Sequence, residues 1–584
     1  MIKKRIESLR KLFIELGING YIIPSNDKYM SEYVPEYAKR LEYITGFTGS
    51  NGLTVICEDT ALFFTDGRYL EQSARELDLS IFQIFDLKDI YLFPWGSYIK
   101  ENAIIGYDPE LFTYPIKSRF FGSLKSPLHK ISGNLVDQIW KDQPQEPASK
   151  VCLHDIAFAG SSHSDKIKEC RKILTENSAD TIIITDASSI CWLLNLRARD
   201  VAYSPLMFSL VILTHSQLYL FINPSRIGEE IIAARPEITI FQEAEFENIL
   251  LKNSQKILVD DSFLSIRIMD LIADKEEYSK QNSIKKITDP CQLLKACKNE
   301  IEIRHAINFH VSDAVALCEF FAELDGMNNL HELTEYDLAK KLTNYRSKQN
   351  GYISDSFPTI CGFKENSAII HYRADQKHAK KIAGEGILLI DSGGQYQGCT
   401  TDITRTIAID MPTSEQKKRY TQVLKGHIAL ANAKFPKDKI TGANLDILAR
   451  QYLWQDNIDY PHGTGHGVGS FLSVHEGPQS INLRSQIILQ PGMILSNEPG
   501  YYIPGEFGIR IENLMYVKEN NNWLEFETLS LVPYANELVE FSILNIDEIN
   551  YIKQYYRKIK SKIYSLLSIK AKIWLDKQIK FFLE

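Results

Sequence analysis

Two aspartates in residues 386–409 are placed to bind a cation together. This segment reads as two apolar strands around a Gly-containing turn, with Asp391 ending the first strand and Asp402 opening the second. A hairpin that turned at 396–397 would bring them directly opposite each other, with Cβ atoms ~4.5–5.5 Å apart. Two like charges that close repel and raise one pKa unless a cation lies between them. Both abut apolar strand residues, which favours a divalent metal site over solvated turn residues.

A second acidic pair repeats this arrangement in residues 495–517. Glu498 follows the apolar run MIL, and Glu512 lies inside the predicted strand IRIENLMYV, which suits a longer loop through 504–505. Four carboxylates and one imidazole are enough for two metal ions ~3.5–4 Å apart, and such a pair of ions turns a shared water into hydroxide at neutral pH. Hard oxygen ligands with one imidazole suit Mn2+, Co2+, Fe2+ or Zn2+.

Three histidines, His462, His466 and His475, lie between the two acidic pairs. Core packing does not require such a concentration of imidazoles. Glycines at every second position from 463 to 469 disfavour a helix, so His462 and His466 are expected to have different roles. The glycines imitate a nucleotide-binding loop, but no clear strand, turn and helix with a downstream acid surround them.

The elements that must position these residues follow a domain pattern. Two polar, Pro-containing stretches, 141–150 and 279–292, are typical of linkers. The two pieces before the second linker share a layout of a helix, an apolar strand and two further strands, at an offset of about 150 to 160 residues. This offset favours a duplicated α/β unit over two unrelated α/β domains.

The chain after residue 297 has a different pattern. A long helix, further helices near 333–346 and 414–433, and strand pairs joined by Gly-rich turns predict an α+β domain. We therefore predict an N-terminal α/β domain, a second related α/β domain, a catalytic domain and a basic helical extension, at 1–150, 151–296, 297–545 and 546–584.

The last segment, 551–584, holds nine Lys and Arg against two Asp and Glu, with apolar residues at helical spacing. A basic amphipathic helix can bind a membrane surface or a partner. The favoured alternative is a terminal helix docked on its own acidic protein or on a second subunit.

Composition excludes several classes of protein. The 584 residues are 44 % apolar and 24 % charged, as in a globular chain of three or four domains, and the net charge of −8 provides no basic field for nucleic acid. Nine scattered cysteines without a CxxC pair disfavour a disulfide framework or a Cys zinc site. The first 17 residues read as an amphipathic helix, not a signal peptide, and no apolar run is long enough to span a bilayer. We expect a cytoplasmic protein without nucleic-acid or membrane partners.

Five motifs, in order, resemble the pita-bread metallopeptidases and, within them, the cytosolic aminopeptidase P (Xaa-Pro aminopeptidase) family. They are GFKENSAIIHYRA, LLIDSGGQYQGCTTDITRT, HGTGHGVGSFLSVHEGP, NEPGYY and GIRIEN. The resemblance extends to ITGFTGSNG and FFTDGRYLEQ in the first domain. It implies two creatinase-type α/β domains before a pita-bread catalytic domain, two divalent metal ions, most often Mn2+ with Co2+ or Zn2+ as alternatives, and a homodimer.

The resemblance also implies residue roles. The five metal ligands fall on Asp391, Asp402, His466, Glu498 and Glu512, the residues that the spacing had assembled, with Asp402 and Glu512 bridging both ions. Substrate contacts fall on His371 and His475, which hold the peptide and stabilise the tetrahedral intermediate, on His462, which lines the proline pocket, and on Arg68, for which a structural salt bridge is the alternative. Glu498 can carry a proton from the attacking water to the leaving nitrogen. Arg510, two positions before Glu512 on an alternating strand, could orient a ligand carboxylate.

The expected reaction is hydrolysis of the bond between an N-terminal residue and a penultimate proline by a dimetal-bound hydroxide. Prolidase shares the site but cleaves dipeptides and commonly has one N-terminal domain, so the duplication disfavours it. Methionine aminopeptidases lack such large N-terminal domains. A binding protein of this fold without activity, or a metal-free creatinase-like hydrolase, is disfavoured because the resemblance leaves all five ligand positions intact.

Overall fold

The computed structural model describes residues 1–253, 256–273 and 284–583. They form two compact units, which we describe separately. The first comprises Met1–His154 and Ser162–Cys291, and the second comprises Asp155–Ser161 and Gln292–Glu584. Among the described residues, no helix combines the length and the apolar character needed to span a membrane.

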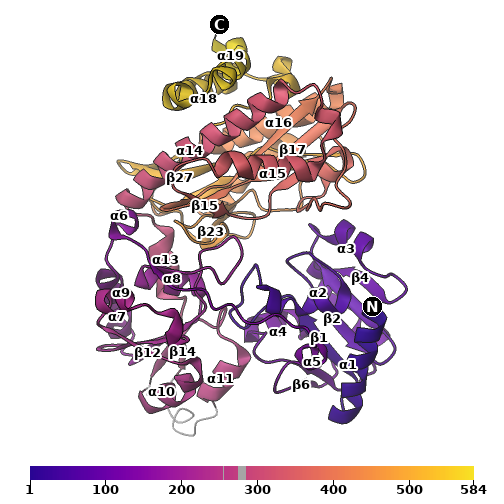
Figure 1. The fold of residues 1–584 in the computed structure, drawn as a ribbon, viewed down its shortest axis with the longest axis vertical. Helices are drawn as coiled ribbons and strands as arrows, with labels where there is room; N and C mark the ends of the chain where they lie inside the picture. The colour runs from indigo at the N-terminus through magenta and orange to yellow at the C-terminus, as the bar shows by residue number, and fades with distance from the viewer. Residues whose placement is uncertain (254–255, 274–283, 584) are drawn as a thin grey trace. The chain divides into compact units, whose positions relative to one another are not determined.

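The first unit contains two six-stranded sheets of the same topology (Figure 1). One has the order β4-β3-β2-β1-β5-β6, from β1 (Gly20–Pro24), β2 (Leu53–Cys57), β3 (Ala61–Thr65), β4 (Phe82–Asp86), β5 (Ile105–Tyr107) and β6 (Leu128–Lys130). The other has the order β12-β11-β10-β8-β13-β14, from β8 (Thr181–Ile184), β10 (Leu210–Thr214), β11 (Leu218–Phe221), β12 (Ile238–Phe241), β13 (Ile257–Val259) and β14 (Ile284–Lys286).

Strand directions also agree between the two sheets. In each sheet the first strand pairs antiparallel with the second, the second pairs antiparallel with the third, and the remaining three pairings are parallel. An identical order with identical directions is the arrangement that a duplicated unit predicts.

One predicted linker is partly wrong. Residues 141–150 contain no helix or strand, as expected. In the stretch 279–292, however, Ile284–Lys286 forms β14 of the second sheet, and α13 (Pro290–Ala296) begins at the proline. Residues 279–283 lie outside the described part of the chain. Ile284 pairs with Ile257 in a parallel ladder, so backbone hydrogen bonds override a polar composition at this sheet edge.

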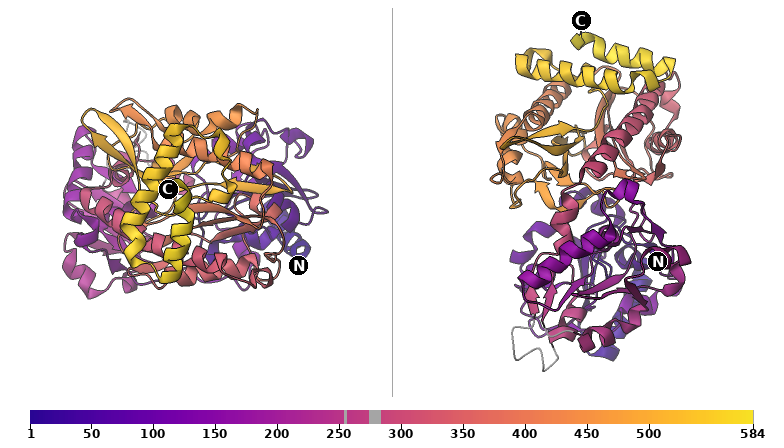
Figure 2. Two further views of the ribbon diagram at one scale, coloured as in Figure 1. Left: turned by 90° about the horizontal axis from the view of Figure 1, so that it is seen from above. Right: turned by 90° about the vertical axis from the view of Figure 1, so that its left-hand side faces the viewer.

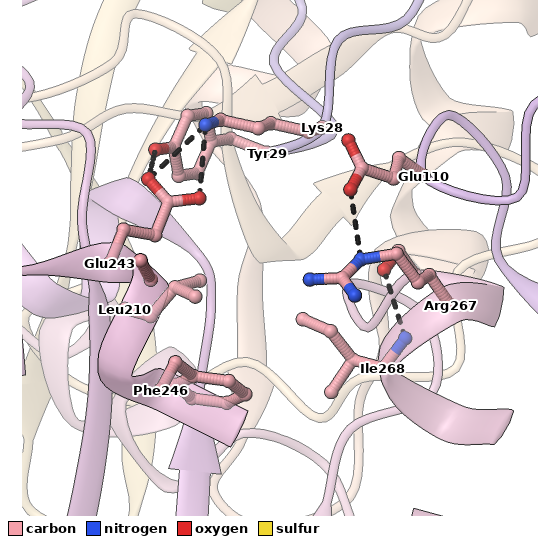
Figure 3. Close-up of a pocket in the computed structure, with 10 residues that line it drawn as sticks. Lys28, Tyr29, Glu110, Leu210, Glu243, Phe246, Arg267 and Ile268 are labelled. Atoms are coloured by element: carbon pink, nitrogen blue, oxygen red, sulfur yellow. Dashed lines mark hydrogen bonds and ion pairs between the residues drawn. The ribbon is translucent and has the colours of Figure 1, made fainter. Parts of the chain in front are cut away.

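Ion pairs connect the two sheet domains of the first unit around a cavity of about 250 Å3 (Figure 3). On one side, Lys28 lies 2.9 Å from a carboxylate oxygen of Glu243. On the other side, Arg267 lies 2.8 Å from Glu110. Because these pairs join residues from both sheet domains, they help to fix the two domains against each other.

The second unit places long helices over its sheets (Figures 1 and 2). The helices are α14 (Glu300–Asp325), α15 (Glu335–Arg346), α16 (Ser414–Ala431) and α17 (Gly442–Trp454).

One sheet has the order β16-β17-β20, from β16 (Ile360–Phe363), β17 (Gly386–Ser392) and β20 (Ile403–Ile409). A six-stranded sheet has the order β21-β28-β27-β24-β22-β23, from β21 (Lys434–Pro436), β28 (Trp523–Thr528), β27 (Asn513–Asn520), β24 (Ile494–Asn497), β22 (Gly465–Gly467) and β23 (Glu476–Ile481). Smaller sheets are β15 (Tyr352–Asp355), β18 (Gly394–Tyr396) and β19 (Cys399–Thr400), and the pair β25 (Gly500–Ile503) and β26 (Phe507–Arg510).

The C-terminal segment packs on its own unit. Helices α18 (Ile546–Ile563) and α19 (Ile569–Leu583) lie side by side and contact α14 (Figure 2). Ile559 and Leu575 are completely buried there. Lys577 lies 2.9 Å from Asp325 on α14. The apolar face of the basic tail is therefore covered in part by the same chain: Ile563 and Leu567 are also buried, whereas Leu566 and Ile573 are exposed.

A buried ion pair stabilises this unit. The Nε of Arg346 on α15 donates a hydrogen bond of 2.8 Å to Asp313 on α14, and the hydroxyl of Tyr396 donates one of 2.9 Å to the same carboxylate oxygen. The Arg346 side chain is fully buried. Removal of one partner would leave a buried charge without its counter-charge, which costs more than the intact pair contributes.

We expect Asp313→Ala to lower the free energy of unfolding of the second unit by about 3–5 kcal/mol, because Arg346 stays buried without its carboxylate. Asp325→Ala, at the exposed end of the same helix, is the control and should cost about 0–1 kcal/mol. Urea denaturation followed by circular dichroism measures both. Equal losses in the two variants would contradict the assigned role of the buried pair.

Candidate metal centre and active site

The first acidic pair is closely placed, but not in the predicted register. Asp391 pairs with Thr404 in the β17–β20 ladder, so Asp402 lies two residues away from the position directly opposite. The expected turn at 396–397 is also wrong, because Tyr396 pairs with Cys399 and the turn falls at 397–398. In an antiparallel ladder, a shift of two residues keeps the same face. The two carboxylates are therefore diagonal neighbours.

The second acidic pair lies between two antiparallel strand pairings, β24 with β27 and β25 with β26. Both pairings follow the same residue register. Asn497 pairs with Asn513 in the first pairing, and Gly500 pairs with Arg510 in the second. The same register places Glu498 opposite Glu512. The single strand predicted around Glu512 is thus two strands, β26 and β27, interrupted at 511–512. The hairpin turn falls at 504–506, as expected from the loop through 504–505.

His466 presents one ring nitrogen to the acids. No helix forms around it, as the glycines predicted, and it lies in strand β22. Its Nδ1 is 2.9 Å from the carbonyl oxygen of Gly467, which can only accept, so Nδ1 carries the proton. Its Nε2 lies 3.5 Å from Asp402 and 3.5 Å from Glu498. The backbone thereby fixes the tautomer that leaves a lone pair for a metal ion.

These side chains fit a bound cation. Asp402, His466 and Glu512 each offer a ligand atom, all within 4.8 Å of one another. Among the described residues, the buried Oδ1 atoms of Asp391 and Asp402 have no hydrogen-bond donor. Burial, followed by the charges of neighbouring carboxylates, raises the pKa of Asp402 and of Glu512 well above the usual range. A divalent cation would supply the missing partner and remove the repulsion.

Arg510 orients two of the acids. Its Nη2 donates a hydrogen bond of 2.7 Å to Asp391. Its Nε donates one of 3.2 Å to the hydroxyl of Thr404, which in turn donates one of 2.7 Å to Glu512. Arg510 and Thr404 therefore satisfy one oxygen of Asp391 and one of Glu512.

Glu498 differs electrostatically from the other acids. Burial alone would raise its pKa, but the adjacent His466 and His462 and the guanidinium of Arg510 outweigh that effect and lower it. The hydroxyl of Ser496 donates a hydrogen bond of 3.1 Å to its carboxylate. Glu498 is thus ionised at neutral pH and available to accept a proton.

His462 is held as a neutral imidazole. Burial is the main cause that lowers its pKa to about 4. Its Nδ1 donates to the carbonyl of Gly463 at 2.7 Å, and its Nε2 accepts from the hydroxyl of Tyr502 at 2.9 Å. Tyr502 itself accepts a hydrogen bond of 2.9 Å from Arg510, so a continuous chain runs from His462 to Asp391.

The other predicted histidines lie near this centre. The ring of His475 contacts that of His466, with centroids 4.3 Å apart. His371 is not in a strand, as the run AIIHY had suggested, but in a turn after η7 (Lys364–Ala368). The turn forms because the N–H of Tyr372 bonds to the carbonyl of Ile369. Local turn hydrogen bonds here override β propensity.

Arg68 belongs to the first unit. Its guanidinium forms hydrogen bonds of 2.8 and 2.7 Å to Asp66, two residues earlier in the same turn. This is the salt bridge that the sequence left as an alternative. A contact of Arg68 with substrate stays a prediction.

Several residues that support the site were not predicted from the sequence. Thr404 and Tyr502 are described above. Arg405 donates to the backbone carbonyl of Glu512 at 2.6 Å and to the side chain of Asn513 at 2.7 Å. His427, on α16, bonds to the carbonyl of Asn497 at 3.0 Å and to Asn513 at 3.2 Å. Thr404, Arg405 and Tyr502 lie in quoted motifs, but nothing in the sequence around His427 links it to the acids.

Known protein families match successive parts of the chain. Residues 304–519 match metallopeptidase family M24, and 522–582 match the C-terminal region of that family. Residues 5–137 and 142–302 each match a creatinase/prolidase N-terminal domain. The predicted fold class is thereby confirmed.

Individual relatives match along almost the entire chain. Xaa-Pro aminopeptidase 1 of Dictyostelium discoideum is 37 % identical over 99 % of this chain and 96 % of its own length. Aminopeptidase P2 of Arabidopsis thaliana is 36 % identical over 97 % and 86 %. Among solved structures, an X-prolyl aminopeptidase of Caenorhabditis elegans, described as a cytosolic enzyme with a di-nuclear active site, superposes with a TM-score of 0.92 and 31 % identity over 99 % of both chains.

The fold and the acid cluster thus define a metallopeptidase, an enzyme of the pita-bread class. Within that class, the chain belongs to the Xaa-Pro aminopeptidases of family M24.

Metal should stabilise the protein more at higher pH. The pKa values of Asp402 and Glu512 are higher in the folded state than in the unfolded chain. At a pH between the unfolded-state and the folded-state pKa of each group, the metal-free folded protein therefore binds more protons than the unfolded chain. Its stability therefore falls as pH rises through that window, whereas a bound cation replaces those protons. We expect the gain in Tm from added Mn2+ to grow between about pH 5 and about pH 8. Differential scanning fluorimetry measures this, and a gain independent of pH would contradict the assignment.

Proposed function

We propose that the chain binds two divalent metal ions and hydrolyses the peptide bond between an N-terminal residue and a penultimate proline. The residues that would hold the ions are Asp391, Asp402, His466, Glu498 and Glu512. One observation carries the proposal. Buried carboxylate oxygens that have no donor in the described part of the chain converge with one imidazole nitrogen of fixed tautomer. Mn2+ is the proposed metal, with Co2+ or Zn2+ as alternatives.

Bound divalent ions supply positive charge that acidifies water and polarises a carbonyl group. Glu498, ionised at neutral pH, would take a proton from the attacking water and give it to the proline nitrogen. That nitrogen is tertiary in the peptide and must be protonated before it leaves. The role of Glu498 thus depends on its low pKa, to which the neighbouring imidazoles and the guanidinium of Arg510 contribute.

Histidines hold the substrate in this proposal. His371 and His475 bind the peptide and donate hydrogen bonds to the oxyanion that forms at the carbonyl carbon. His462 is neutral and packs against Tyr460 and Tyr502, with ring centroids 4.9 and 5.4 Å away. An uncharged surface of rings suits the apolar pyrrolidine of proline.

Three further features belong to the proposal. We propose a homodimer in the cytoplasm, with peptides of more than two residues among the substrates. The two creatinase-type sheets of the first unit favour this function over that of a prolidase, which commonly has one such domain. Light scattering would test the dimer, and fractionation of the source cells would test the location.

The direct test uses the peptide Arg-Pro-Pro. With Mn2+ present, we expect release of free Arg and the dipeptide Pro-Pro, and chelation should abolish the reaction because the centre loses its cations. Chromatography of the products, with Arg-Ala-Ala as control, measures both. Cleavage restricted to Xaa-Pro dipeptides would favour prolidase, and no cleavage by the metal-loaded protein would contradict the proposal.

Asp402→Ala should lose metal and turnover together, because Asp402 belongs to the three residues whose ligand atoms lie within 4.8 Å of one another and the reaction would depend on the bound ions. The matched control is Glu385→Ala, an exposed carboxylate just before the same hairpin. Elemental analysis gives the metal content, and hydrolysis of Arg-Pro-Pro gives the rate. Normal metal content and rate in the Asp402 variant would refute its role as a ligand.

A further inference from the structure

We propose that Glu335 is a positioning residue for this reaction: its buried carboxylate fixes the 363–380 segment and thereby places the imidazole of His371. Glu335 begins helix α15 and is completely buried. It is more than thirty residues from His371 in sequence and belongs to none of the motifs quoted above. The proposal rests on the proposed function, in which His371 binds the substrate.

Four donors from the segment that contains His371 converge on this one carboxylate. The backbone N–H of Phe363 lies 2.7 Å from Oε1, and that of Lys380 lies 2.8 Å from Oε2. The side-chain amide of Asn366 reaches both oxygens, at 3.0 and 3.1 Å, and the hydroxyl of Tyr372 lies 2.7 Å from Oε2. These donors come from both ends and from the middle of the segment, so one side chain fixes its path.

The partners require an ionised carboxylate at position 335. Backbone N–H groups and the amide nitrogen can only donate, and the hydroxyl of Tyr372 donates to Glu335, so all four need an acceptor. Burial raises the pKa of Glu335, and the hydrogen bonds from Phe363, Tyr372 and Lys380 oppose that rise. A glutamine of the same shape would turn its NH2 group toward at least one donor. That donor would be left buried without a partner.

The opposite side of the segment is fixed to the strand that supports the metal centre. The N–H of Gly508 in β26 donates to the hydroxyl of Ser367 at 2.7 Å. The two backbones are so close that a Cβ on Gly508 would come within 2.1 Å of the carbonyl oxygen of Ser367. The Nη2 of Arg510, which holds Asp391, also lies 3.5 Å from the carbonyl of Ile370.

His371 therefore lies between two fixed neighbours. Ile370 contacts Arg510, and Tyr372 contacts Glu335. Loss of the Glu335 contact would release the segment on one side while the acids of the metal centre keep their own partners. We expect substrate binding to weaken and metal binding to persist, which distinguishes positioning from general destabilisation.

The experiment compares Glu335→Gln with Asp337→Asn in the metal-loaded enzyme. Asp337 is exposed on the first turn of α15 and accepts hydrogen bonds from Thr334 in a capping box, so its variant weakens the same helix without touching the 363–380 segment. For Glu335→Gln we expect the KM for Arg-Pro-Pro to rise about ten- to hundred-fold, because a small misplacement of a binding group costs this much. Mn2+ affinity, measured by calorimetric titration, should stay within about two-fold of wild type, since no metal ligand contacts Glu335. Asp337→Asn should keep wild-type kinetics.

Two further variants make the test specific. Tyr372→Phe removes one of the four donors, and its KM should lie between those of the wild type and Glu335→Gln. In a His371→Ala background, Glu335→Gln should add little further loss, because both changes act through the same imidazole. An undiminished additional loss in that background would overturn the proposal.

Hydrogen exchange supplies a readout that does not depend on catalysis. We expect amides in 364–372 to exchange faster in Glu335→Gln than in Asp337→Asn. Unchanged exchange in this segment, or identical KM values in the two variants, would overturn the role of Glu335. Failure of the wild-type enzyme to cleave Arg-Pro-Pro would instead contradict the proposed function, and the exchange comparison would still decide whether Glu335 fixes the segment.

Discussion

The repulsion among buried carboxylates is the constraint on which this structure depends. The four acids of the centre lie close together in a site largely removed from water, where unscreened charges interact strongly. They are Asp391, Asp402, Glu498 and Glu512. Burial and mutual repulsion raise the pKa of Asp402 and Glu512, whereas Glu498 keeps a low pKa beside its imidazole and guanidinium neighbours. Such a cluster needs added positive charge: protons neutralise individual carboxylates, whereas divalent ions stabilise the ionised form.

The surrounding residues fix the orientation of the ligand side chains but do not neutralise every acid. Arg510 satisfies one oxygen of Asp391, while the other is left without a donor among the described residues. The carbonyl of Gly467 holds His466 in one tautomer. The hydroxyl of Thr404 accepts a hydrogen bond from Arg510 and donates one to Glu512. The surrounding residues therefore preorganise the site and leave ligand atoms free.

Residues could be predicted from the sequence where the chemistry of a side chain and the pattern of its neighbours indicate the same role. Acidic residues beside apolar strands and an imidazole among glycines identified the residues that converge, and the repeated layout before residue 290 predicted the two matching sheets. The prediction failed on register, because the turn at 397–398 depends on the β18–β19 pairing, which spacing alone does not specify. His371 was placed in a strand because its neighbours are apolar, whereas tertiary hydrogen bonds form a turn there. Long-range partners such as His427 leave no local pattern.

His427 joins the two strands that lie beside Glu498 and Glu512. Its two ring nitrogens bond to residues next to Glu498 and next to Glu512, and burial, its main perturbation, lowers its pKa to about 3. The imidazole of His427 is thus uncharged across the physiological pH range. It adds no positive charge that would repel a cation at the nearby acids. Helix α16 also forms an ion pair with α18 through Lys425 and Glu548. The C-terminal helices are therefore joined to the strands beside Glu498 and Glu512 through α16, by one ion pair and two hydrogen bonds.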